Sequence, residues 1–476
     1  MMFAMHGSVR EDDGRRRQTP LLLLLGLLVL FGLTATKGIA STDDHASAVE
    51  GWRIASAGNP WLEGVVAGLD PDPWLHEVPN GHVVADRMIG PAFICVPFYL
   101  LFHLGSGAQD FWLVPAGLAS ATTLAFAGLL MFLALRRLGE SRALLAALAF
   151  AVATPTWSVS ANSPWTHTVT QFGLAGAAFA ASRGRWWLVG VFLAVGVTGR
   201  PHLAVVALVL GVGVTVTTRS LTPMVQVGVP SLLGLAGLAL VNHGLFGAWA
   251  VTSVGYAGHA AALLTGPPAN DPIMGSYSYP MGVAGLLFSP DRGVLVWTPV
   301  LLVLAPGLWV RRRQVPAWAW FLALGGVTYT ALQLQLDYFG GGDHFYGYRI
   351  ALELITCVTP ALAFASRGAG RWTLRAAGVL IGLQAAAISV GATSDGYFVV
   401  ASRVWHDNSL LMALREHPVP VSSWLLLCAA AGLMLVLRAE DRLVDASEAG
   451  AAVLAMRREQ LVTQPAGYGR APDPVD

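Results

Sequence analysis

Residues 20–45 read PLLLLLGLLVLFGLTATKGIASTDDH, an apolar run followed by a polar segment that ends in the adjacent carboxylates Asp43 and Asp44 and in His45. Basic residues precede the run at Arg15 to Arg17, as they precede a signal peptide or a first membrane span. No clean A-x-A cleavage site follows the run. We therefore expect an uncleaved span that holds the two carboxylates at the edge of a membrane.

The composition of the chain is that of a membrane protein. Hydrophobic residues make up 55% of the 476 positions and charged residues 12%, about half the charged share of a soluble domain. The net charge of +1 gives no reason to expect a nucleic acid as a partner, and the lipid bilayer is the expected surroundings. The three cysteines are far apart, which favours neither a disulfide framework nor a zinc site: Cys95, Cys357 and Cys428.

The apolar runs number thirteen, and charge decides which of them cross. If the run 91–104 does not cross, 21 of the 29 Lys and Arg residues fall on one side, as the positive-inside rule predicts for a cytoplasmic N-terminus and C-terminus. Fourteen helical residues also extend only about 21 Å, short of the roughly 30 Å hydrocarbon core. The sequence thus predicts an all-α fold with about twelve transmembrane helices. The runs are 20–36, 91–104, 112–135, 143–161, 166–182, 186–199, 201–217, 224–245, 293–310, 317–336, 350–366, 376–394 and 424–437.

The membrane topology has one expected helical hairpin and one apolar run that is not expected to cross. Gly199-Arg200-Pro201 is interpreted as the outer turn of a short helical hairpin, because the residue before proline disfavours helix; one fused span over 186–217 is the alternative. The run 91–104 is expected to be an interfacial or re-entrant helix of a long first outer loop. The predicted organisation is a cytoplasmic segment 1–19, a membrane domain 20–437, a loose polar cytoplasmic tail 438–476, and outer regions at 37–111, 246–292 and 395–423.

Several outer segments resemble a known family. The acidic pair after the first span, the long first outer loop and the polar turn 162–167 resemble the GT-C superfamily of integral-membrane glycosyltransferases, which use polyprenyl-phosphate-linked sugars. Three strings are similar to its bacterial members, such as those of glycosyltransferase family 39: NHGLFG at 242–247 followed by Tyr256, GLLFSPDRG at 285–293, and GGDHFYGYR at 341–349. The resemblance covers about residues 20–437. In that branch proline usually precedes the final arginine, whereas Tyr348 stands here.

The resemblance implies an inverting transfer of a sugar from a polyprenyl-phosphate donor to a hydroxyl of a lipid, glycan or protein. The site would face outward from a bacterial plasma (inner) membrane. An outer acidic residue would be the base, which places this role on Asp44 or Asp43. We prefer Asp44, because His45 could orient it and a half-desolvated neighbouring carboxylate raises its pKa. The alternative is that the pair caps a helix expected at about 46–57.

Cations near the outer ends are the candidates for the donor phosphate: His167, His344, Arg349 and Arg292. Each has a structural alternative: His167 as a satisfied core histidine, Arg292 neutralised by Asp291, and Arg349 paired with Glu353 four residues later. Substrate contacts are predicted at His45, Glu63, Trp165, Asp343 and Tyr348, although aromatic residues also anchor at membrane interfaces.

No metal ligand set is assigned. Asp43 with His45, or Asp343 with His344, offers too few ligands for a complete shell. Some members of the superfamily use a divalent cation and others do not, so the resemblance leaves that cofactor open.

Two other functions compete with a transferase. A transporter of about twelve spans is one, and the string Ala85-Asp86-Arg87-Met88-Ile89-Gly90 even resembles the D-R-x-G string of major-facilitator carriers, though on the outer rather than the cytoplasmic side. A flippase of lipid-linked sugars, or a non-enzymatic assembly partner, is the other. Transporters place functional polar groups near the midplane, whereas the candidates in this sequence cluster at outer ends.

Overall fold

The computed structural model describes residues 2–35, 41–63, 75–78, 81–106, 110–253, 278–394 and 397–438. All thirteen predicted apolar runs coincide with helical structure, and the all-helical membrane fold is confirmed. The tail 439–476, and with it nearly all of the predicted cytoplasmic tail, lies outside the described residues, as do Lys37, Trp74, Tyr256 and Tyr277.

Most neighbouring helices of the bundle are joined by short connections, and the longer connections include 35–113, 247–278 and 394–408. The first half contains α1 (Met2–Thr34), α4 (Val114–Leu135), α5 (Glu140–Val152), α6 (Thr166–Ser182), α7 (Trp186–Val197), α8 (Ala204–Thr218) and α9 (Thr222–Phe246). The second half contains α11 (Tyr279–Phe288), α12 (Val294–Trp297), α13 (Val300–Val310), α14 (Ala317–Leu336), α15 (Leu352–Ala365), α16 (Arg371–Thr393), α17 (Ser409–Glu416) and a last helix, Pro418–Arg438. Short 3₁₀ turns and one π-turn, Thr156–Ser160, complete the set: Arg136–Leu138, Pro201–Leu203, Arg312–Gln314, Ser366–Gly368 and Ala401–Arg403.

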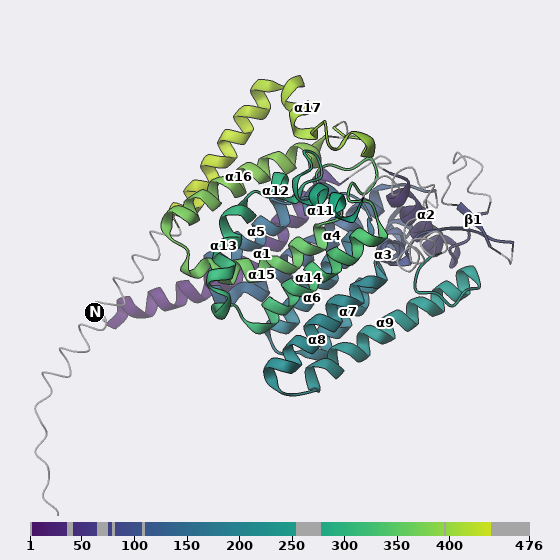
Figure 1. Ribbon diagram of the computed structural model, residues 1–476, viewed down its shortest axis with the longest axis horizontal. Helices are drawn as coiled ribbons and strands as arrows, with labels where there is room; N and C mark the ends of the chain where they lie inside the picture. The colour runs from purple at the N-terminus through teal and green to yellow at the C-terminus, as the bar shows by residue number, and fades with distance from the viewer. Residues whose placement is uncertain are drawn as a thin grey trace, which may run out of the picture.

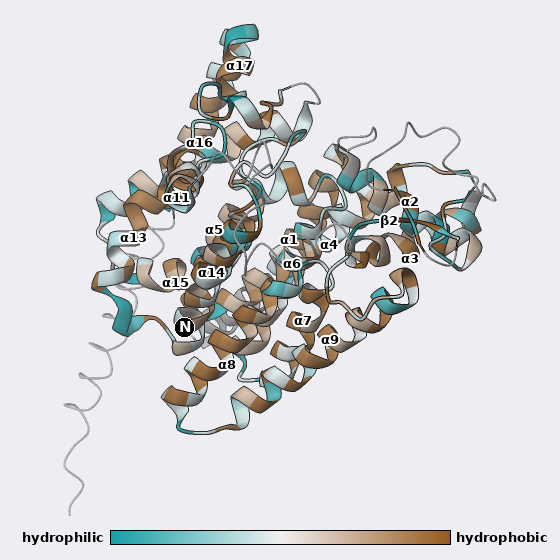
Figure 2. Ribbon diagram, turned by 45° about the vertical axis from the view of Figure 1, so that its right-hand side comes forward, coloured by the Kyte–Doolittle hydropathy of each residue, from teal (hydrophilic) through white to brown (hydrophobic). Residues whose placement is uncertain are grey.

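Among the described residues, five helices are long and apolar enough to cross a membrane. They are Val114–Leu138, Pro201–Thr218, Thr222–Phe246, Arg371–Thr393 and Pro418–Arg438. The surface agrees with this: α9 leaves Val225, Val229, Leu232, Leu233 and Leu240 exposed, and hydrophobic colour runs along α7, α8 and α9 (Figure 2). Such a continuous apolar surface is typical of contact with lipid. The total of about twelve spans stays a prediction.

The segment between α1 and α4, predicted to be the first outer loop, forms a small cap at the end of the bundle opposite the N-terminus (Figure 1). It contains α2 (Thr42–Ala57), α3 (Ile89–Ser106) and an antiparallel pair of three-residue strands, β1 (Leu75–Glu77) and β2 (Val83–Ala85). The strands were not predicted, because three residues carry too little periodic pattern to be recognised. The helix expected at about 46–57 begins earlier, at Thr42, because Ser41 is its N-cap.

Helix α3 lies across the end of the bundle. Its residues Cys95 and Tyr99 pack in one cluster with Ala48 of α2 and with Leu113, Ala116 and Ala119 at the start of α4. Its opposite face leaves four large apolar side chains exposed: Phe93, Leu100, Leu101 and Leu104. The helix has no Asp, Glu, Lys or Arg and is apolar on both its packed and its exposed face, which is typical of contact with lipid. The interfacial interpretation of the run 91–104 stays a prediction. The helix is longer than that run, with 18 residues.

The break predicted at Gly199-Arg200-Pro201 is confirmed, because α7 ends at Val197 and a 3₁₀ turn begins at Pro201. Both Gly190 of α7 and Gly211 of α8 lie against α9 near Val227, so α7 and α8 run antiparallel as a hairpin. Two predicted loops differ from expectation, since α11 lies within 246–292 and the last helix starts at Pro418, inside 395–423.

The last helix packs against α16 through small residues. A Cβ built on Gly382 would lie 2.0 Å from the Cys428 carbonyl oxygen, and one built on Gly378 would lie 2.8 Å from the Gly432 carbonyl oxygen. Only glycine permits the two backbones to approach this closely, as in other membrane helix pairs.

Candidate functional site

Asp43 lies between two arginines that come from distant parts of the chain. Its Oδ1 is 2.6 Å from Nη2 of Arg87, and its Oδ2 is 3.0 Å from Nη1 of Arg349. The Asp43 side chain is 26% exposed, whereas those of Arg87 and Arg349 are 3% and 10% exposed. The three side chains, called here the Asp43 cluster, thus carry one net positive charge and open to the outside on the carboxylate side.

Local structure fixes each member of the cluster. Asp43 lies in the first turn of α2. Arg87 lies two residues after the end of β2, and its Nη1 donates to the Asp86 carbonyl at 3.0 Å. Arg349 precedes α15, and its guanidinium lies over the rings of Trp165 at 4.8 Å and Phe345 at 5.2 Å. Cation–π contacts of this kind stabilise a partly desolvated arginine. The arginines are therefore held before any ligand arrives.

The predicted pairing of Arg349 with Glu353 is wrong. Helix α15 begins at Leu352, so Arg349 does not share a helical face with Glu353. Arg349 instead pairs with Asp43, 306 positions away in sequence. Arg349 therefore belongs to the Asp43 cluster and not to a local helix pair.

Asp44 has a different role from its neighbour. Its Oδ1 accepts from the Ser41 N–H at 2.8 Å, from the Ser41 hydroxyl at 3.1 Å and from the His45 N–H at 3.0 Å. This reciprocal arrangement with the Ser41 side chain is a capping box, which satisfies N–H groups that the first turn leaves unpaired. The Asp44 side chain is fully buried. Thus the capping alternative holds for Asp44.

The two carboxylates also differ in acidity. Burial raises the pKa of Asp44 to about 6, opposed by hydrogen bonds from Ser163 and Ser41. For Asp43, burial by itself acts in the same direction, but the charges of Arg349 and Arg87 outweigh it and lower the pKa of Asp43 below its ordinary value. At neutral pH the Asp43 carboxylate is therefore ionised and held by the arginines.

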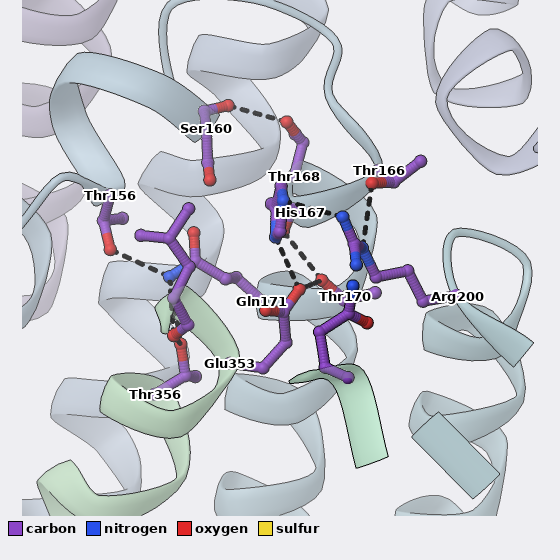
Figure 3. A network of polar contacts seen from close by, with 12 residues as sticks. Thr156, Ser160, Thr166, His167, Thr168, Thr170, Gln171, Arg200, Glu353 and Thr356 are labelled. Carbon is purple, nitrogen blue, oxygen red and sulfur yellow. Dashed lines mark hydrogen bonds and ion pairs between the residues drawn. The ribbon is translucent and has the colours of Figure 1, made fainter. Parts of the chain in front are cut away.

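His167 lies in a buried polar network between α6, α15 and the turn before α8 (Figure 3). Arg200 Nη2 is 3.0 Å from His167 Nε2 and can only donate, so Nε2 accepts and Nδ1 carries the proton. Nδ1 donates to Glu353 Oε1 at 2.8 Å, and Thr170 donates to the same oxygen at 2.5 Å. Gln171 extends the network to Thr156 and Thr356.

This network leaves His167 no ring nitrogen for a phosphate. Both nitrogens have protein partners and the side chain is fully buried. The structure therefore favours the alternative of a satisfied core histidine. The Arg200, His167 and Glu353 side chains together carry no net charge, which is how a charged pair is tolerated inside an apolar bundle.

Arg292 is buried as well, and the prediction that it binds phosphate is not supported by its position. Its Nη1 donates to the carbonyls of Phe345 and Gly347 at 2.9 Å each, and its Nη2 donates to the Val399 carbonyl at 2.7 Å. Asp291 lies 3.1 Å from Nη1. With no exposed surface, Arg292 holds the loop that carries Phe345, and Phe345 in turn lies under Arg349.

Gly347 contributes to the same loop. It has φ +89°, a conformation that side chains rarely adopt, and a Cβ there would lie 2.8 Å from the Pro155 ring. The string resembling the family at 341–349 thus forms the support of Arg349. Tyr348, predicted to contact substrate, is buried, and its hydroxyl lies 2.8 Å from that of Thr298.

The remaining predicted substrate residues are spread over the outer end. His45 packs edge-on against Phe111 and Trp165 lies buried under Arg349. Glu63 accepts from Val83 at 3.0 Å and contacts His82. Asp343 accepts from the Ala401 N–H at 2.6 Å, and exposed His344 lies near the Phe398 ring. Of these, Trp165 is part of the support of the cluster, and the others stay predictions.

Arg87 was missed as a site residue. The sequence indicated a basic residue in the predicted first outer loop, but the string that contains Arg87 was interpreted only as a possible carrier motif. Arg200 was noted only as part of a turn, and its contact with His167 joins segments 33 positions apart. Neither the contact of Arg87 with Asp43 nor that of Arg200 with His167 follows from local spacing.

A cavity of about 270 Å³ is lined by polar side chains that include Arg200, His202, Gln333 and Asp337, and by no member of the Asp43 cluster. Its wall includes Met88 and Thr166, which follow Arg87 and Trp165 in the chain. Apolar side chains continue the wall along α9 and α14: Leu235, Leu332 and Leu336. Within the described part of the chain, no three His, Cys, Asp or Glu side chains are grouped so that they could hold a metal ion.

No protein-family model and no curated protein sequence matches this chain. Among solved structures, the chain is similar to the crystal structure of ArnT from Cupriavidus metallidurans in the apo state, with a TM-score of 0.45 and 15% identity over 88% of this chain and 76% of that chain. It is also similar to the crystal structure of ArnT from Cupriavidus metallidurans bound to undecaprenyl phosphate, with a TM-score of 0.43 and the same identity and coverage. Similarity at this level assigns no ligand, activity or site residue to this chain.

Proposed function

We propose that the protein is a membrane glycosyltransferase that takes a sugar from a polyprenyl-phosphate donor and transfers it to an acceptor hydroxyl. The observation that carries this proposal is Asp43 held between Arg87 and Arg349 at an open position. A cavity lined by Met88 and Thr166, the residues that follow Arg87 and Trp165 in the chain, and by leucines of α9 and α14 adds to it. A base, two phosphate-binding cations and room for a lipid chain are the groups that such a transfer needs.

The arginines would receive the donor phosphate. Guanidinium groups bind phosphate oxygens through paired N–H donors, and both guanidiniums already point at an anionic group, the Asp43 carboxylate. A phosphate would compete with that carboxylate for the same donors. The prenyl chain would then run along the apolar wall formed by Leu235, Leu332 and Leu336.

This competition would activate Asp43. While paired with the arginines, Asp43 has a lowered pKa and is a weak base. When phosphate oxygens occupy the arginines, the lowering influence weakens and burial, which acts in the opposite direction, gains weight. The pKa of Asp43 would rise only once the donor is bound. Base strength would thus depend on donor occupancy.

The transfer then follows with all atoms accounted for. The acceptor hydroxyl oxygen forms a bond to the anomeric carbon while the bond from that carbon to the phosphate oxygen breaks. The hydroxyl proton goes to Asp43, and polyprenyl phosphate leaves with the electron pair, stabilised by Arg87 and Arg349. A single displacement of this kind inverts the anomeric configuration, and no covalent enzyme intermediate is required.

This assignment moves the base from Asp44, the residue preferred from sequence, to Asp43. Asp44 is fully buried and serves as the cap of α2, so an acceptor hydroxyl has no route to its oxygens without opening the first turn. Asp43 has the exposure and the neighbouring cations. We further propose that the site faces outward from a bacterial inner membrane with both termini cytoplasmic, in agreement with the charge distribution.

The test is turnover with defined donors. Purified protein in liposomes would be supplied with a panel of radiolabelled polyprenyl-phosphate sugars and a mixture of lipid, glycan and peptide acceptors. We expect label to leave one donor and polyprenyl phosphate to accumulate in equal amount. Movement of intact donor between leaflets without cleavage would instead identify a flippase, and no reaction of any donor in folded protein would oppose the proposal.

A further inference from the structure

A second cavity, of about 150 Å³, lies between α5, α13, α15, α16 and the last helix. Its walls are almost entirely aliphatic, with side chains such as Leu145, Leu301, Ile355, Leu362 and Ile381. None of its lining residues is a member of the Asp43 cluster or of the first cavity. It therefore requires an explanation apart from the proposed transfer.

The cavity extends along the helix axes, and hydrogen bonds between neighbouring segments lie at each of its two ends. At one end, Gln384 of α16 donates to the Ala153 carbonyl at 3.3 Å and accepts from the Val300 N–H at 3.3 Å. At the other end, Arg367 donates to the Arg137 carbonyl. Along α16 the lining runs from Leu374 to Gln384, ten residues or about 15 Å. This is about half of the roughly 30 Å hydrocarbon core, the depth of one leaflet.

The deep end offers no hydrogen-bonding group to a ligand. Gln384 is engaged as described, Thr154 donates to the Phe150 carbonyl at 2.7 Å, and the Thr298 hydroxyl lies 2.8 Å from that of Tyr348. A hydrocarbon chain needs no such partner, whereas a polar molecule would lose its hydrogen bonds to water there. The part of any ligand that enters must therefore be apolar.

The other end is strongly basic. Arg142 lines the cavity there and is half-buried. The three segments at this end, 136–142, 311–316 and 366–375, together contain nine arginines and one carboxylate, Glu140. Basic pockets between membrane helices on the cytoplasmic side attract anionic lipid headgroups. The charge and the shape of the cavity thus both indicate a ligand with an anionic headgroup and an apolar tail.

We propose that this cavity holds one acyl chain of an anionic glycerophospholipid, with the lipid phosphate at Arg142. The lipid would come from the leaflet on the arginine-rich side. It would fill the space between α16, α13 and α5 and would link the last helix to the rest of the bundle. A polyprenyl phosphate, a zwitterionic lipid and the chain's own C-terminal tail are the competing occupants.

Native mass spectrometry of delipidated full-length protein tests the proposal, with phosphatidylglycerol and phosphatidylcholine of the same acyl chains as probes. One arginine near an anionic headgroup corresponds to about a fivefold effect on affinity. We expect wild-type protein to prefer phosphatidylglycerol by at least about that factor. Arg142→Gln should lose about that preference, and Ala149→Phe, which fills the cavity, should weaken binding of both lipids.

Arg183→Gln is the matched control, since Arg183 follows α6, lies over Phe179 and does not line the cavity. It should bind both lipids like wild type. If Ala149→Phe does not remain monodisperse, Ile381→Phe fills the same space from α16. Equal affinity of wild type for both lipids, displacement of phosphatidylglycerol by polyprenyl phosphate, unchanged binding in the filled variant, or no binding of either lipid would each overturn the proposal.

Discussion

Replacing Asp43 with Asn removes the charge between Arg87 and Arg349 and keeps the size of the side chain. The amide is not a base, so we expect kcat to fall about 10²–10⁴-fold, the usual contribution of a positioned general base. Arg87 and Arg349 would also lose their carboxylate. Removing one partner of a buried ion pair costs about 3–5 kcal/mol, and since the Asp43 side chain is 26% exposed we expect about 1–3 kcal/mol here.

Asp44→Asn is the matched control, because it makes the same chemical change one residue along the chain. The amide oxygen can still accept from the Ser41 and His45 N–H groups, so the expected loss of stability is about 1 kcal/mol. Turnover should stay within about tenfold of wild type. Single-turnover release of radiolabelled sugar in liposomes measures turnover, and thermal melting of the same preparations measures the loss of stability. Wild-type turnover in Asp43→Asn, or an equal loss in Asp44→Asn, would refute the assignment.

Three further predictions concern fully buried titratable or charged side chains. Burial raises the pKa of Glu50 to about 8, and neither carboxylate oxygen has a hydrogen-bond partner among the described residues. The contribution of Glu50 to the free energy of unfolding should be complete below its ordinary pKa of 4.5 and lost as pH rises through about 8. The melting temperature of the wild type should therefore fall over this pH range, and Glu50→Gln should reduce that fall. Parallel curves of melting temperature against pH for the two proteins would contradict this. Arg292→Gln should cost about 3–5 kcal/mol and abolish transfer, because three loop carbonyls lose their donor; thermal melting and turnover with Arg292→Lys as comparison would show whether charge alone suffices. His167→Gln and Glu353→Gln should be coupled by about 0.5–3 kcal/mol in a double-mutant cycle of melting data, since the two side chains share a hydrogen bond; additive effects would argue against the network.

The sequence predicted the helices well because a helix depends on local composition. Each apolar run is long enough to recognise on its own, and Gly199-Arg200-Pro201 carries its own helix-breaking signal. The short strands and α11 were missed because three or ten residues within a loop carry little periodic pattern.

The site was predicted only in part, since its contacts join distant segments. Asp43 and Arg349 were both named, and the alternative to phosphate binding by Arg349 was a pair with Glu353, the partner that helical spacing suggests. The start of α15 at Leu352 removes that pairing. The burial of individual side chains could not be predicted either. His167 and Arg292 have suitable chemistry for phosphate, but both are fully buried with protein partners.

Affinity for polyprenyl phosphate tests the central claim most directly, because the claim is that a lipid phosphate displaces the Asp43 carboxylate from Arg87 and Arg349. Binding would be titrated with wild type, Asp43→Asn and Arg349→Gln. We expect Asp43→Asn, although inactive, to bind about tenfold more tightly than wild type, because the competing anion is gone and about 1.4 kcal/mol corresponds to tenfold. Arg349→Gln should bind more weakly. Weaker binding by Asp43→Asn than by wild type, in folded protein, would contradict the account.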